Sequence, residues 1–105
     1  MTKVYINNSD GRIILKVQNH TKSDVCTAIS TLLYTLAENV IRAESKGKVE
    51  EFNYRLNPGD AFLNVKPKAG YFNDILNLFS MIKAGFELLV IQYPKHIELT
   101  AMGGV

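Results

Sequence analysis

Two reverse-turn signals, each set between runs of alternating apolar residues, constrain the fold of this chain most. Asp10-Gly11 separates the first pair of runs, and Pro58-Gly59 separates the second pair. Glycine adopts the positive φ that a tight turn needs, so either dipeptide between alternating runs is typical of a β-hairpin. The sequence therefore predicts two hairpins, whose strands lie at 3–7, 12–18, 49–56 and 61–65.

Each hairpin is followed by a segment in which apolar residues recur at the 3.6-residue period of an α-helix. The first helix is expected to begin at Ser23 or Asp24, since both residue types cap unpaired amide groups, and to close at Gly47. The second helix is expected over Tyr71–Gln92. A short strand over 96–101 then ends the order ββαββαβ.

This order favours an α+β sandwich in which both helices pack on one face of a mixed or antiparallel sheet. At 105 residues the chain is expected to form a single domain over 1–105. Gly85, inside the second helix, predicts a close packing contact. Tyr5, Ile14 and Phe62 fall among polar residues on the other sheet face, which leaves room there for a partner subunit.

Charge and cysteine content argue against several classes of protein. The formal net charge is only +2, and the basic residues are spread from Lys3 to Lys95, so no nucleic-acid partner is expected. A single cysteine cannot form an internal disulfide and suits the reducing cytoplasm. The amino terminus lacks the apolar core of a signal peptide, and polar residues interrupt the apolar stretch over 75–93. We expect a soluble, cytoplasmic protein with no membrane partner.

The candidate catalytic residues are His20 and Cys26, six positions apart where the second strand meets the first helix. Cysteine attacks as a thiolate, and its ordinary pKa of about 8.5 leaves only a few per cent ionised at neutral pH. Amide groups at a helix start and a neighbouring imidazolium both lower that pKa. We interpret Cys26 as a nucleophile and His20 as its base, supported by Ser30 and by Asp24, which could cap the helix or orient His20.

Plainer interpretations of these residues stand beside the catalytic one. Cys26 could be a small core residue and His20 a surface loop residue. His96 is a rival base, although it also fits a solvated connection between elements. One cysteine and two histidines fall short of a structural zinc set, and no glycine-rich phosphate loop is present. We therefore expect no metal and no cofactor.

One stretch of the sequence suggests a family. His20 closes the second strand, Asp24-Val25-Cys26 opens a helix, and Ser30 follows four residues later. This pattern resembles the ribosomal-processing cysteine protease Prp family, whose signature is Gly-His-Ala, a glycine-rich loop, then Asp-hydrophobic-Val-Cys-Ala-Ala and a serine. The resemblance extends along nearly the whole chain, including the order of elements and the last helix and strand.

The chain departs from the family signature next to the histidine. Asn19 replaces the glycine before it, and Thr21 replaces the alanine after it. One hydrophobic residue of the motif is missing, and the loop between His20 and Cys26 is several residues shorter than usual. In the family this loop is thought to order over bound substrate, so its length bears on substrate choice and gating. Asn19 and Thr21 are expected to contact the substrate.

The resemblance implies a single Prp-like cysteine protease domain with His20 as base and Cys26 as nucleophile. The family's role implies trimming of a short N-terminal extension from a ribosomal protein, and phage-borne relatives act on capsid or scaffold proteins. The family's fold also implies a homodimer. The alternative hypothesis is a non-catalytic dimeric module of the same fold that binds a peptide or a ribosomal surface. A basic nucleic-acid binder is a third.

Overall fold

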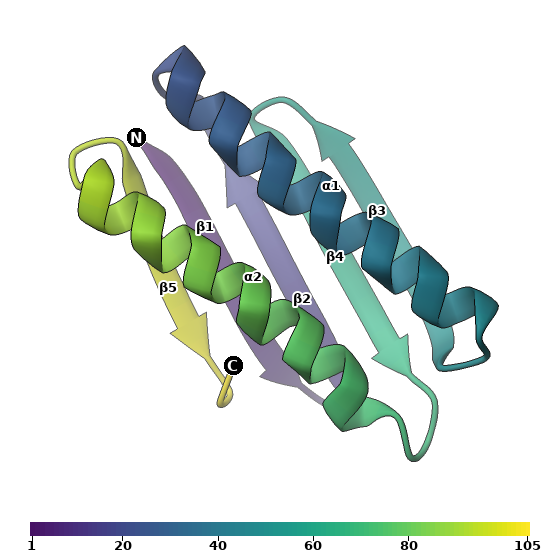
Figure 1. Ribbon diagram of the computed structural model, residues 1–105. Helices are drawn as coiled ribbons and strands as arrows, with labels where there is room; N and C mark the ends of the chain where they lie inside the picture. The colour runs from purple at the N-terminus through teal and green to yellow at the C-terminus, as the bar shows by residue number, and fades with distance from the viewer.

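The computed structural model describes residues 1–105 and has the predicted order ββαββαβ (Figure 1). Two helices cover a five-stranded mixed sheet, so the predicted α+β class is confirmed. The elements are β1 (Thr2–Ser9), β2 (Arg12–Gln18), α1 (Ser23–Ser45), β3 (Val49–Asn57), β4 (Asp60–Pro67), α2 (Phe72–Gln92) and β5 (Ile97–Met102).

The strands of the sheet lie in the order β3-β4-β2-β1-β5. All neighbouring pairs are antiparallel except β1 and β5, which are parallel. A parallel neighbour needs a crossover rather than a tight turn, and here α2 provides the connection to β5. The register aligns Ile6, Leu15 and Leu63 across three adjacent strands, and all three are fully buried. This row forms the centre of the face on which the helices pack.

Both helices lie on the same face of the sheet, as predicted (Figure 1). Phe79 and Phe86 of α2 are fully buried in the single core between the two layers. Gly85 lies so close to α1 that an added Cβ would be 2.6 Å from Cδ2 of Leu32. The close contact predicted at Gly85 is therefore confirmed. Neither helix is long and apolar enough to span a membrane.

The helix α1 begins at Ser23, as predicted, but its cap differs from the prediction. Lys22, not Ser23 or Asp24, is the N-cap residue, and no side chain caps the helix. The Asp24 carboxylate instead accepts a hydrogen bond of 3.0 Å from the amide of Val25. The amide of Cys26 donates to the carbonyl of Lys22 at 3.0 Å. Cys26 thus lies in the first helical turn, where the amides that precede it have no intrahelical acceptor.

The exposed apolar side chains are concentrated on the helical layer rather than on the open face of the sheet. Tyr5, Ile14 and Phe62 lie on the open face, as predicted, and are half-buried among polar neighbours. On α2, by contrast, Met81 and Ile91 are 72% and 75% exposed. The open face therefore carries these apolar side chains among polar ones, as the sequence pattern indicated.

Candidate active site

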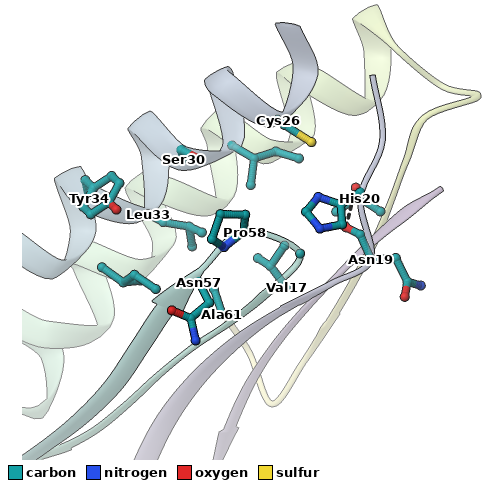
Figure 2. A pocket seen from close by; sticks show the side chains of 14 residues that line it. Val17, Asn19, His20, Cys26, Ser30, Leu33, Tyr34, Asn57, Pro58 and Ala61 are labelled. Atoms are coloured by element: carbon teal, nitrogen blue, oxygen red, sulfur yellow. Dashed lines mark hydrogen bonds between the residues drawn. The ribbon is translucent and has the colours of Figure 1, made fainter. Parts of the chain in front are cut away.

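A pocket of about 80 Å³ lies where β2 ends, α1 begins and β3 turns into β4 (Figure 2). Cys26, Ser30 and Tyr34 line it from α1. Residues four apart share one face of a helix, so the spacing of these three side chains directs them to the same side. His20 lines the pocket from the loop that follows β2. The two residues predicted to be catalytic therefore lie on one pocket.

The main chain that carries His20 is fixed by contacts with two distant segments. Asn19 has a φ of +74°, in the left-handed region that asparagine tolerates better than most residues. Its amide donates to the carbonyl of Gly59 at 2.9 Å. Its carbonyl accepts a hydrogen bond of 3.0 Å from the hydroxyl of Thr2. These contacts set the direction in which the chain leaves β2, while the His20 side chain itself stays exposed.

The sulfur of Cys26 is contacted by the same short loop. The amide of Thr21 donates to Sγ at 3.4 Å, and the thiol donates to the carbonyl of Thr21 at 3.5 Å. Figure 2 shows the sulfur and the His20 imidazole facing the same space, and no hydrogen bond joins them. In this conformation the loop, not the imidazole, holds the sulfur.

The other predicted residues take different positions. Asp24 is exposed, does not line the pocket and contacts only the next amide of its own turn. Ser30 lines the pocket, whereas Thr21 reaches the site through its main chain. The rival base, His96, does not line the pocket, and its carbonyl accepts a 2.9 Å hydrogen bond from the amide of Thr2. The structure thus groups Ser30 with His20 and Cys26 in one pocket, and His96 does not line it.

Several residues that line the pocket were not predicted as site residues, among them Thr2, Tyr34 and Gly59. Thr2 is a buried polar residue at the start of β1, and no local pattern marks it. Gly59 was recognised only as a turn residue. Tyr34 could have been found, because it continues the four-residue spacing from Cys26 through Ser30. Its ring is 59% exposed although it lies on a helix that covers the core.

Sequence comparison alone gives no match to a known family profile or to a curated protein. The fold, however, is similar to that of solved structures of a processing protease. The essential ribosomal processing protease Prp from S. aureus, in complex with a covalently linked product peptide, is similar with a TM-score of 0.71 and 18% identity over 96% of this chain and 99% of that chain.

Two further structures have the same fold. Prp from S. aureus in complex with a substrate peptide gives a TM-score of 0.68 at 13% identity, over 96% of this chain and 99% of that chain. A protein from Streptococcus mutans gives 0.68 at 18% identity, over 98% and 95% of the two chains. This chain therefore has a Prp-like fold along nearly its whole length, and the resemblance predicted from the sequence is confirmed for the fold.

Proposed function

We propose that this protein is a Prp-like cysteine endopeptidase. Its substrate is the N-terminal extension of a ribosomal protein, or a phage capsid or scaffold protein. The observation that carries the proposal is that Cys26, in the first turn of α1, and His20 line one pocket. Further support comes from the S. aureus neighbour, a ribosomal processing protease that has a product peptide covalently linked.

The proposed reaction is a two-step acyl transfer. His20 takes the proton from the Cys26 thiol, and the thiolate attacks the carbonyl carbon of the scissile peptide bond. Amides in the first turn of α1 stabilise the negative oxygen of the tetrahedral intermediate. The C–N bond then breaks, and His20 gives its proton to the departing amine. Water, deprotonated by His20, attacks the thioester, which releases the acid product and restores the thiol.

The reaction requires a change in the loop between the two residues. Both the amide and the carbonyl of Thr21 contact the Cys26 sulfur, and no hydrogen bond joins that sulfur to His20. We propose that a bound peptide displaces the carbonyl of Thr21 from the sulfur, so that the imidazole takes over the thiol proton.

The substrate would be held by both polar and apolar groups around this pocket. Asn19 and Thr21 flank His20. The exposed side chain of Asn19, and the main chain of Thr21 once it is displaced from the sulfur, would contact an extended peptide. Leu33 and Leu56 contribute apolar surface to the pocket, which suits an apolar substrate side chain next to the scissile bond. We propose that the enzyme works in the cytoplasm as a homodimer, as its family resemblance implies. Light scattering at several concentrations measures the dimer directly.

The deciding experiment compares the native protein with Cys26→Ala. Candidate precursors, a ribosomal protein that carries its N-terminal extension and a phage capsid protein, are incubated with each and analysed by mass spectrometry. We expect a single new N-terminus with the native protein and none with the variant. His20→Ala should cleave almost nothing. Cleavage that is equally fast with Cys26→Ala would rule out the cysteine mechanism.

A non-catalytic peptide-binding module is the second candidate, and one observation favours it. The Cys26 thiol donates its proton to the carbonyl of Thr21 rather than to an imidazole, which is the arrangement of an unreactive cysteine. Alkylation of Cys26 across a range of pH separates the two candidates. A nucleophile should show an apparent pKa well below about 8.5, whereas a structural thiol should react slowly throughout. Slow alkylation together with tight peptide binding would support the module.

A further inference from the structure

We infer that Gly59 is a positioning residue for the His20 imidazole. Glycine has no Cβ, and the site requires this because the ring occupies the space that a Cβ would need. The inference rests on the proposed function, because it assigns Gly59 a part in the activity of the same pocket. Gly59 lies in the turn between β3 and β4, far from His20 in sequence, and lines the same pocket.

The imidazole of His20 occupies the space that a side chain at position 59 would need. A Cβ at Gly59 would lie 2.5 Å from Nε2, 2.7 Å from Cδ2 and 2.9 Å from Cε1 of His20. These distances are shorter than carbon and nitrogen atoms tolerate without a bond, since contacts of this kind are optimal at about 3.5–4.0 Å. The ring of His20 therefore fills the space beside Gly59, and any larger residue there would displace it.

The same glycine also holds the main chain beside His20. Its carbonyl accepts the 2.9 Å hydrogen bond from the amide of Asn19. The carbonyl of Asn19 in turn accepts from the Thr2 hydroxyl at 3.0 Å. The β3–β4 turn thus sets the position of His20 in two ways, through the backbone that carries it and through the surface on which its ring rests. Proton transfer depends on placing the base correctly, and small misplacements are costly.

The chain supplies a matched control for this contact. Gly59 has a φ of +71°, and Gly11, in the β1–β2 turn, has a φ of +74°. Alanine at either position is forced into the same unfavourable backbone region. At Gly11, however, an added Cβ would meet no atom within 4 Å. Gly59→Ala and Gly11→Ala therefore share the backbone strain, and only the first meets the imidazole.

The experiment follows the ring of His20 by NMR and the cleavage of a precursor by mass spectrometry in the two variants. We expect both variants to lose similar thermal stability. Only Gly59→Ala should shift the His20 ring signals. It should lower kcat/KM about 10- to 100-fold, which is less than the full contribution of roughly 100- to 10,000-fold that a general base supplies. In a His20→Ala background, Gly59→Ala should lower cleavage no further.

Two results would overturn the inference: unchanged His20 ring signals in Gly59→Ala, or the same shift in Gly11→Ala. If Gly59→Ala fails to fold, Thr2→Val replaces it. This change removes the hydrogen bond to the Asn19 carbonyl without adding an atom beside the ring, and it should also shift the His20 signals. Should the native protein cleave nothing while Gly59→Ala alone shifts the ring signals, the positioning role stands and the proposed protease activity fails.

Discussion

The two ends of the sheet both contain residues with positive φ, but only one end carries the candidate site. At the lower end in Figure 1, Asp10 and Gly11 reverse the chain between β1 and β2. Their φ values are +54° and +74°, and Gly11 has open space beside it. At the upper end, Asn19 and Gly59 also have positive φ, but they contact each other and His20. Residues with positive φ thus reverse the chain at one end and shape a pocket at the other.

This contrast indicates where changes should affect activity and where they should affect only stability. Contacts at the lower end join neighbouring elements across exposed surface, as in the ion pair between Lys48 and Asp74. Contacts at the upper end converge on a few atoms around Cys26 and His20. The following predictions test this contrast, beginning with the largest effect.

Removal of the Cys26 sulfur should have the largest effect on cleavage and little effect on stability. Cys26→Ala is expected to reduce cleavage at least about 1,000-fold, because the proposed acyl intermediate forms on the Cys26 sulfur. Cys26 is only half-buried, so the melting temperature should change little. Mass spectrometry of the products and a thermal melt measure the two effects. A large loss of stability with the sulfur removed would show that Cys26 belongs to the core instead.

A matched pair of valine substitutions compares the two ends directly. Asn19→Val and Asp10→Val each force a β-branched residue into a positive φ, so each should lower the free energy of unfolding by about 1–2 kcal/mol. Only Asn19→Val is expected to reduce cleavage as well, because Asn19 orients the chain at His20. Asn19→Gly is the conservative control and should retain activity. Urea unfolding and cleavage rates give both values, and equal losses of activity at the two ends would contradict the contrast.

The lower end offers a smaller test at Lys48. Its ammonium group pairs with Asp74 at 3.1 Å and lies 5.7 Å from the ring centre of Tyr71. Both contacts are partly exposed, so Lys48→Ala should cost less than about 1 kcal/mol of stability. Cleavage should stay at the native rate. A drop in cleavage would mean that the two ends are coupled through α1 or the sheet.

The smallest expected effect concerns one carboxyl group at the lower end. Hydrogen bonding and charge interaction with the Arg12 guanidinium lower the pKa of Glu51 below its ordinary value. Stabilisation from a lowered pKa is present above the unfolded-state pKa and is lost as the pH falls through the folded-state pKa. Arg12→Met should therefore raise the pKa of Glu51 in an NMR titration. It should leave cleavage at neutral pH unchanged, and a titration curve identical to the native one would refute the assignment.

Most of the fold could be predicted because its signals are local. The alternating runs gave the hairpins around Asp10-Gly11 and Pro58-Gly59, and the 3.6-residue period gave both helices. The cap of α1 was predicted wrongly. The helix begins at Ser23, as predicted, but its N-cap residue is Lys22, although Ser23 and Asp24 have the suitable side chains. A cap depends on the direction of the incoming chain, which residue types alone do not specify.

The site was less accessible to sequence reasoning, for a physical reason. The pairing of His20 with Cys26 could be proposed because both belong to one junction. The contacts that fix His20 come from elsewhere, with Thr2 lying 17 positions from Asn19. Such contacts follow from the strand order, which brings the start of β1, the end of β2 and the β3–β4 turn to one end of the sheet. No pattern along the chain encodes them locally.

The exposed position of Tyr34 in the pocket suits a fluorescent probe of peptide binding. The chain contains no tryptophan, so Tyr34→Trp would create a single indole fluorophore beside Cys26 and Ser30. Peptide arriving in the pocket would displace water from that indole and change its emission. Occupancy could then be followed in real time, in native protein and in variants that cut nothing, so recognition and chemistry become separately observable.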